Sequence, residues 1–174
     1  MNLIVAVDKN WGIGKNNKLL TSIPADMKFF VSKTTGNVVV MGRKTLESFP
    51  NKKPLKNRVN IVLTRNPDYQ VEDCIMVHGE YELFDAISQY RPDDVYLIGG
   101  GTLYTRFYRY CNRLYVTKID AVLDADTFIP DFDADPAFEV ISESEPVTEN
   151  GLTYRFVVYQ KTAEGLERSR TLYF

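Results

Sequence analysis

One carboxylate near the start of the chain has the surroundings of a group that handles protons. Asp26 is followed by Phe29 and Phe30, and positions i, i+3 and i+4 share one face of a helix. Because desolvation disfavours the charged form of a carboxylate, we expect a raised pKa for Asp26 and a surface that could hold a flat heterocycle. A structural interpretation is also open, since Asp26 follows Pro24 and acids are common in a first helical turn.

Three other segments combine glycines, hydroxyls or cations directly after a β-rich run. They are Gly42-Arg43-Lys44-Thr45, Thr64-Arg65 and Gly99-Gly100-Gly101-Thr102. Ligands of open α/β sheets bind outside the carboxyl ends of the strands, where a following helix start can receive phosphate. An Arg without a nearby acid favours NADP over NAD, because Arg can meet the 2′-phosphate. Taken singly, each segment also fits a solvated helix start, a surface turn or a tight packing turn.

Composition limits the class of protein. With 174 residues, 44% hydrophobic and 13% aromatic, the chain can fill one core, so we expect one domain. A formal net charge of −2 gives no field that attracts polyanions, so no nucleic-acid partner is expected. The two cysteines lack zinc-ligand spacing and are expected to be buried thiols. No segment has the length or flanks of a membrane span or signal peptide, so we expect a cytoplasmic protein.

The elements that must position these residues alternate between strand and helix. Apolar runs typical of buried strands occupy residues 3–7, 38–41, 59–63, 75–77, 95–98 and 114–119. Helical patterns occupy residues 25–35, 44–49, 81–90 and 102–110. This alternation predicts a three-layer α/β fold, with a mostly parallel central sheet of about eight strands and flanking helices.

Three segments depart from that alternation. Residues 9–23 lack periodicity and are predicted to be a mobile loop, which is either a lid or an ordinary connector. Residues 138–142 and 153–160 flank Glu149-Asn150-Gly151 and predict a C-terminal antiparallel hairpin at one sheet edge. The residues from Thr162 onward are polar, and we expect a frayed tail or a short terminal extension.

Six motifs lie in the order and spacing of one enzyme family. They are Val5-Ala6-Val7-Asp8, Gly12-Ile13-Gly14, Ile23-Pro24-Ala25-Asp26-Met27, Val40-Met41-Gly42-Arg43-Lys44-Thr45, Ile98-Gly99-Gly100-Gly101 and Asp126-Thr127-Phe128-Ile129-Pro130. Through them the chain resembles dihydrofolate reductase over residues 1–161, which leaves 162–174 as a C-terminal extension. The resemblance implies a dihydrofolate reductase-like fold and NADPH-dependent reduction of 7,8-dihydrofolate to 5,6,7,8-tetrahydrofolate, a step of one-carbon metabolism and an antifolate target.

The resemblance also implies roles for residues of the substrate site. Asp26 matches the acid that bonds the amidine edge of the pteridine and assists protonation at N5. Thr117 matches a position that supports this acid, and Arg58 matches the arginine that grips the glutamate carboxylate of the substrate. The full set of substrate positions implied in this way is Val5, Ala6, Asp26, Phe29, Phe30, Ser48, Phe49, Leu55, Arg58, Ile98 and Thr117.

The cofactor implied by the resemblance is NADPH, and no metal is implied. The peptide bond between Gly99 and Gly100 is cis in the family, and His78 falls near the adenine side. The expected partners are dihydrofolate and NADPH alone, bound by a monomer. The cofactor positions are Ala6, Ile13, Gly14, Gly42, Arg43, Lys44, Thr45, Leu63, Thr64, Arg65, Ile98, Gly99, Gly100, Gly101, Thr102, Leu103, Tyr104 and Thr127.

One segment departs from the family pattern. The family usually has Leu-Pro-Trp before the acid helix, whereas this chain has Leu19-Leu20-Thr21, which removes a ring and an indole donor from the pocket. Two other functions are open beside the reductase, and the second of them is suggested by Thr21. A pyrimidine reductase of the riboflavin pathway should lack the acid-aromatic helix and Arg58. A binding module that senses NADPH or folate would bind both without turnover.

Overall fold

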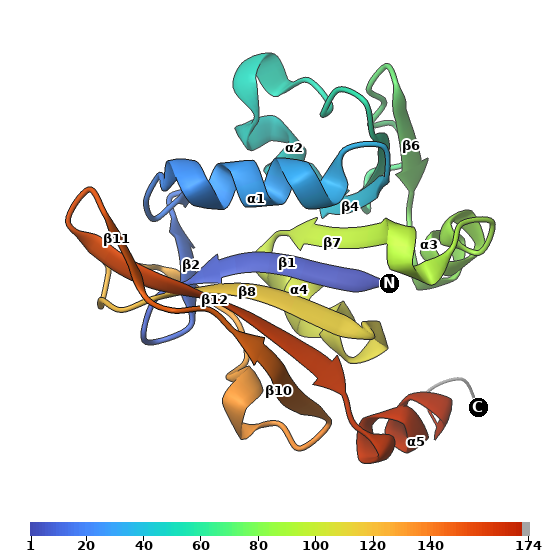
Figure 1. The fold of residues 1–174 in the computed structure, drawn as a ribbon. Helices are drawn as coiled ribbons and strands as arrows, with labels where there is room; N and C mark the ends of the chain where they lie inside the picture. The colour runs from blue at the N-terminus through green and yellow to red at the C-terminus, as the bar shows by residue number, and fades with distance from the viewer. Residues whose placement is uncertain (172–174) are drawn as a thin grey trace.

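The computed structural model describes residues 1–171 of the chain. Within them, nine strands form one central sheet in the order β10-β12-β8-β1-β7-β4-β5-β6, with β11 beside β12, and a smaller sheet has the order β3-β2-β9 (Figure 1). The strands are β1 Asn2–Val7, β2 Gly12–Lys15, β3 Lys18–Leu19, β4 Val38–Gly42, β5 Val59–Leu63, β6 Cys74–Val77, β7 Val95–Gly99, β8 Arg113–Ile119, β9 Thr127–Phe128, β10 Phe138–Glu143, β11 Val147–Glu149 and β12 Leu152–Lys161.

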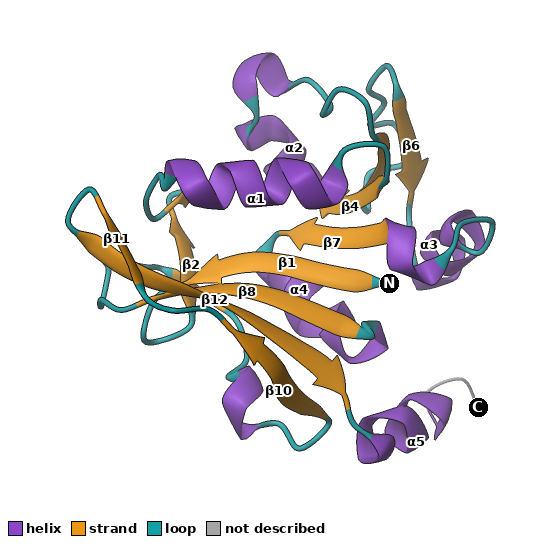
Figure 2. Ribbon diagram, viewed as in Figure 1, coloured by secondary structure: helices purple, strands orange, loops and turns teal. Residues whose placement is uncertain are grey.

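Helices cover both faces of the central sheet (Figure 2). They are α1 Pro24–Thr34, α2 Arg43–Ser48, α3 Glu80–Ile87, α4 Gly101–Phe107 and α5 Ala163–Thr171. Alternate residues of β4 face opposite layers: Val38 and Val40 pack with α3 and α4, whereas Val39 and Met41 pack with α2. Strands buried on both faces form continuous apolar runs in the sequence, which is why the sequence predicted the ends of these strands to within one residue.

The pairing confirms a mixed sheet that is mostly parallel. β1, β4, β5, β6, β7 and β8 run parallel to one another, and β12 adds an antiparallel edge to β8. The expected hairpin needs one correction, because the turn at Asn150 and Gly151 joins β12 to the short strand β11, while β10 pairs with the far half of β12. Both turn residues have positive φ, 52° and 77°, as a tight hairpin requires.

The prediction of a mobile loop without regular structure over residues 9–23 was wrong for residues 12–19. β2 and β3 form a hairpin whose turn residues, Asn16 and Asn17, have φ of 51° and 60°. The other edge of β2 pairs with β9, more than 100 residues away in the sequence. The Asp126 carboxylate accepts a hydrogen bond from the backbone N–H of Asn16 at 2.9 Å. This hairpin stands at the carboxyl end of β1, where it can form a wall of a site.

The prediction of a frayed tail was also wrong for residues 163–171, which form α5. The Lys161 ammonium donates to the backbone oxygen of Arg109 at 2.6 Å and to Ser169 Oγ at 2.7 Å, which ties the helix to the body. Gly165 packs directly against the backbone of Ala137, where a side chain would not fit. The part of the tail prediction that concerns residues 172–174 lies outside the described residues.

Two further expectations can be compared with the structure. Cys111 is fully buried, whereas Cys74 is partly exposed, so the expectation of two buried thiols holds for one of them. In the described part of the chain, every helix is too short or too polar to cross a membrane.

Candidate active site

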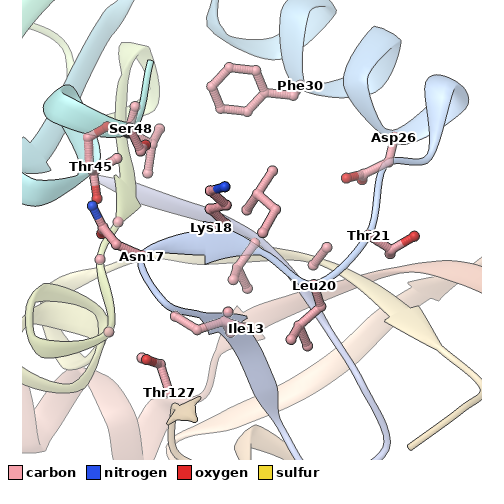
Figure 3. Close-up of a pocket in the computed structure, with 18 of the residues that line it drawn as sticks. Ile13, Asn17, Lys18, Leu20, Thr21, Asp26, Phe30, Thr45, Ser48 and Thr127 are labelled. Carbon is pink, nitrogen blue, oxygen red and sulfur yellow. Dashed lines mark hydrogen bonds between the residues drawn. The ribbon is translucent and has the colours of Figure 1, made fainter. Parts of the chain in front are cut away.

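A cavity of about 510 Å³ opens at the carboxyl ends of β1 and β7 (Figure 3). Its walls are α1, the β2–β3 hairpin, the end of α2 and the turn from β7 into α4. The predicted site residues that line it are Val5, Ala6, Ile13, Gly14, Asp26, Phe30, Thr45, Ser48, Phe49, Ile98, Gly99, Gly100, Gly101, Tyr104 and Thr127. Segments from across the chain therefore meet in one apolar hollow.

Asp26 reaches this cavity from the first turn of α1. Pro24 begins the helix, and no side chain caps it, so the carboxylate is not used as a cap. The Thr117 hydroxyl donates a hydrogen bond to Asp26 Oδ1 at 2.5 Å. Thr117 lies on β8 opposite Ala6 of β1 and is almost fully buried. Asp26 is the one carboxylate among the described residues that line the cavity.

The pKa of Asp26 is raised above its ordinary value of 3.8, as the sequence predicted. Burial in the apolar cavity is the main cause, and the hydrogen bond from Thr117 opposes it by favouring the charged form. The group can therefore hold a proton closer to neutral pH than an exposed aspartate can.

The two aromatic residues predicted beside Asp26 separate in the structure. The Phe30 ring faces the cavity on the same side of α1 as Asp26 (Figure 3). Phe29 points to the sheet instead, where its ring centroid lies 4.9 Å from that of Phe156 and 6.2 Å from that of Tyr115. The expectation that both rings wall the acid was therefore wrong, and Met27, which the sequence argument omitted, lines the cavity.

Arg58 and Leu55 lie outside the cavity lining, in the segment before β5. The Arg58 guanidinium donates from Nε to Thr34 Oγ1 at 3.2 Å and from Nη1 to the backbone oxygen of Lys56 at 2.8 Å. Thr34 ends α1, so Arg58 is fixed to the helix that carries Asp26. The second Nη1 proton and the Nη2 group form no hydrogen bond within residues 1–171 and can receive a carboxylate.

The turn from β7 into α4 forms the opposite wall. The peptide bond between Gly99 and Gly100 is cis, as the family resemblance implied. A Cβ on Gly101 would lie 2.6 Å from Thr127 Cγ2, and one on Gly99, where φ is 139°, would lie 3.1 Å from Thr45 Oγ1. Only a bare backbone fits here, so this turn has the close-approach surface that a dinucleotide needs.

The remaining predicted cofactor residues surround this wall without lining the cavity. Gly42 and Leu63 pair at the carboxyl ends of the neighbouring strands β4 and β5, which brings Arg43, Lys44, Thr64 and Arg65 to one edge. Arg43 is paired with Glu47 at 3.1 Å, whereas Arg65 is exposed and has no ion pair within the described residues. Thr102 and Leu103 lie in the first turn of α4.

The sequence argument named Ile13 and Gly14 of β2 but missed the turn and second strand of the β2–β3 hairpin as parts of the site. Asn17 donates from Nδ2 to the backbone oxygen of Lys44 at 3.1 Å, so the hairpin tip is joined to α2. Thr21, in the place of the family's usual Trp, lies near Asp26 (Figure 3). The lining residues without a predicted role are Ile4, Lys15, Asn17, Lys18, Leu19, Leu20, Thr21, Ile23, Met27, Pro50 and Ile119.

Replacing Thr117 tests whether its hydrogen bond lowers the pKa of Asp26. Thr117→Val keeps the shape and removes the hydroxyl that stabilises ionised Asp26, so the pKa of Asp26 should rise further. Since hydrogen bonds to charged groups contribute about 1.5 to 3 kcal/mol, we expect about a tenfold or larger change in the proton affinity of Asp26. A pH titration of activity measures it. Thr117→Ser is the matched control, and an identical profile in Thr117→Val would contradict the contact.

Comparisons with known proteins give concordant matches. A family model described as dihydrofolate reductase matches residues 1–161. Dihydrofolate reductase of Bacillus subtilis is 38% identical over 162 residues, covering 92% of this chain and 94% of the relative. Bifunctional dihydrofolate reductase-thymidylate synthase 1 of Arabidopsis thaliana is 36% identical, and 96% of this chain matches only 35% of that protein. A solved dihydrofolate reductase from Enterococcus faecalis, complexed with NADP(H) and RAB-propyl, superposes with a TM-score of 0.82 at 34% identity, covering 92% and 95% of the two chains.

Proposed function

The chain belongs to the dihydrofolate reductase family, and we propose that it reduces 7,8-dihydrofolate to 5,6,7,8-tetrahydrofolate with NADPH, using Asp26 to assist protonation of the pterin. The observation that carries the role of Asp26 is its position. The Asp26 carboxylate has a raised pKa and accepts a hydrogen bond from Thr117. It lines the same cavity as the glycine turn, which forms the opposite wall. A pyrimidine reductase of the riboflavin pathway would not need this acid or Arg58.

The wall formed by Gly99, Gly100 and Gly101 is proposed to receive the cofactor. When bound, NADPH supplies the hydride, and the protein supplies orientation and a dry surface. Ile13 and Thr127 close this wall from the hairpin side, and Tyr104 supports it from below by donating its hydroxyl proton to the backbone oxygen of Ile4 at 2.8 Å. Arg43, Lys44, Thr64 and Arg65 lie at the adjacent strand ends, where they suit the phosphate groups.

Asp26 is proposed to bond the amidine edge of the pteridine through its two carboxylate oxygens. One of them is already fixed by Thr117, so the plane of the carboxylate is set before the substrate arrives. Its raised pKa lets it hold a proton in the pH range where N5 must gain one, and Phe30 excludes water from one side. The proton and the hydride would thus reach the same heterocycle from opposite walls.

The proposed unit is a single catalytic domain over residues 1–161 that acts as a monomer, with α5 as a C-terminal extension. Support for the bounds of the catalytic domain comes from the cavity, since every described residue that lines it lies before residue 128. α5 docks on Arg109 and Ala137, which are absent from the lining.

The decisive experiment is an assay of NADPH oxidation by absorbance, with and without dihydrofolate. We expect oxidation only when dihydrofolate is present, with one tetrahydrofolate formed for each NADPH consumed. If calorimetry showed that both ligands bind while no NADPH is consumed, the protein would be a binding module and the proposal would be wrong.

Arg58→Leu tests the proposed grip on the glutamate carboxylate. Loss of a charge-assisted, forked hydrogen bond should raise the KM for dihydrofolate by about 10- to 100-fold, with a smaller effect on kcat. Arg58→Lys keeps the positive charge but cannot form a forked hydrogen bond. Its KM for dihydrofolate should therefore lie between those of the wild type and Arg58→Leu. Steady-state kinetics with a pterin that lacks the glutamate provides the control, because its KM should be equal in all three proteins.

A further inference from the structure

The β2–β3 hairpin carries two lysines on one face. Lys15 of β2 and Lys18 of β3 are direct partners across the hairpin turn, so their side chains project from the same side of the ribbon. Like charges in directly opposite positions destabilise a pair of strands. Local conflicts of this kind are typical of functional sites, which indicates that at least one of the two ammonium groups serves the cavity.

The charges of the two lysines are balanced differently. The Lys15 ammonium is paired with the Asp124 carboxylate. The Lys18 side chain is exposed and has neither an ion pair nor a hydrogen bond within residues 1–171. The nearby Asp126 carboxylate is already bonded to the backbone of the hairpin turn. Of the two lysines, Lys18 is therefore the one whose positive charge is not offset.

The charge of Lys18 acts inside the cavity. Three of the described side chains that line it are charged groups, Lys15, Lys18 and Asp26, and the Lys18 ammonium points into the hollow (Figure 3). Burial and the hydrogen bond from Thr117 shift the pKa of Asp26, and Lys18 does not. The Lys18 ammonium and the Asp26 carboxylate therefore lie apart in the cavity and do not neutralise each other.

The hairpin adjoins the wall that is proposed to hold the nicotinamide. Ile13 of β2 lies so close to the glycine turn that a Cβ on Gly101 would be 3.6 Å from Ile13 Cδ1. Gly14, the next residue of β2, pairs with Leu19, which follows Lys18. The unbalanced ammonium thus belongs to the element that closes the cofactor side of the cavity.

A nicotinamide ring changes its charge during the reaction. The reduced ring is neutral, and it becomes a cation when its hydride, with both electrons of the broken C–H bond, passes to the substrate. We propose that Lys18 discriminates between the two redox states of the cofactor by repelling the oxidised ring, so that NADP⁺ is held less tightly and leaves sooner after turnover. This inference rests on the proposed function, which places the nicotinamide at the glycine wall. Lys18 is thereby a specificity-determining residue.

Lys18→Met tests this role, because Met keeps a long unbranched side chain and removes the charge. Calorimetry gives the Kd for NADP⁺ and for NADPH in both proteins. The phosphates are the same in the two forms of the cofactor, so the ratio of the two Kd values isolates the charge of the ring. We expect the ratio of the Kd for NADP⁺ to that for NADPH to fall by about three- to tenfold in Lys18→Met, the effect of one partly solvated charge interaction. Added salt should reduce this difference between the proteins.

The matched control is Lys15→Met, which removes the partner lysine whose charge Asp124 already balances, and its ratio of Kd values should equal that of the wild type. A second measurement separates charge from damage to the hairpin. Because the Lys18 ammonium opposes formation of the cationic ring, the single-turnover rate of hydride transfer should rise in Lys18→Met, and a lower rate would contradict the electrostatic role.

The outcomes separate this inference from the proposed function. If the wild type binds both forms of the cofactor and Lys18→Met has the same ratio of Kd values, the role of Lys18 is wrong and the cofactor site stands. If both Kd values rise together in Lys18→Met, the ammonium holds an anionic part of the cofactor, and the inference is likewise overturned. If the wild type binds neither NADPH nor NADP⁺, the proposed function itself is wrong.

Discussion

Asp26→Asn should lower kcat at neutral pH by about 10²- to 10⁴-fold, the range that a positioned acid or base contributes. Asn keeps the size of the side chain and can still accept from Thr117, but it cannot hold or release the proton that N5 requires. Steady-state NADPH oxidation measures the loss. The matched control is Asp120→Asn, which neutralises an exposed carboxylate at the end of the same strand that carries Thr117 and should retain wild-type activity.

The same variant should be more stable than the wild type, which distinguishes lost chemistry from lost structure. The pKa of Asp26 in the folded state lies above the ordinary value of 3.8, so ionised Asp26 lowers the free energy of unfolding. This penalty is absent at pH values well below 3.8, grows as pH rises through the folded-state pKa, and is fully present at neutral pH. Thermal unfolding at neutral pH should therefore show a higher Tm for Asp26→Asn. Full activity in this variant would remove Asp26 from the mechanism.

Gly101→Ala should destabilise the protein by about 1 to 3 kcal/mol, as overpacking does, and weaken NADPH binding by more than tenfold, which corresponds to about 1.4 kcal/mol. The new Cβ would lie 2.6 Å from Thr127 Cγ2, so the glycine wall and β9 must move apart. Chemical denaturation and calorimetry measure the two effects.

A second substitution tests whether this collision is the cause. Thr127→Ser removes Cγ2 and keeps the hydroxyl that donates to Asp126 Oδ1 at 2.8 Å. In the Gly101→Ala, Thr127→Ser double variant, the next neighbour of the new Cβ is Ile13 Cδ1 at 3.6 Å, an ordinary contact. The double variant should recover most of the stability and cofactor affinity, and failure to recover either would show that the collision is not responsible.

The central sheet was predictable because its strands are buried on both faces. Runs such as Val38–Gly42 are apolar at every position and are bounded by turn residues, so their type and ends can be read locally. The small sheet was not predictable in this way. β2 and β3 are short and rich in glycine and lysine, and β9, which completes their sheet, lies more than 100 residues away in the sequence. Pairing over that distance leaves no local periodicity.

Helical spacing predicted that Asp26 and Phe30 share a surface, but it did not predict which face of α1 points to the cavity. Asp26, Phe29 and Phe30 share a face in the sequence pattern, yet the sheet below offers an aromatic partner, Phe156, to only one of the rings. Phe29 takes that position, which turns Asp26 and Phe30 to the cavity and brings in Met27. The choice between the two rings depends on Phe156 of β12, which lies far from α1 in the sequence.

The C-terminal helix shows a similar limit. Residues 163–171 are mostly polar and have a single large apolar residue, Leu166, which is half exposed. What fixes the helix is a buried lysine on the preceding strand and the fit of Gly165 against Ala137. Neither contact produces a hydrophobic period in the sequence.

The most direct test of the account is the pH dependence of hydride transfer in a single turnover, measured by stopped flow with dihydrofolate and NADPH already bound. We expect the rate to increase as pH falls, with an apparent pKa above that of an exposed aspartate, and the same dependence to be absent in Asp26→Asn. A rate that does not change with pH in the wild type, or an unchanged pH profile in Asp26→Asn, would contradict the claim that this buried carboxylate governs protonation of the pterin.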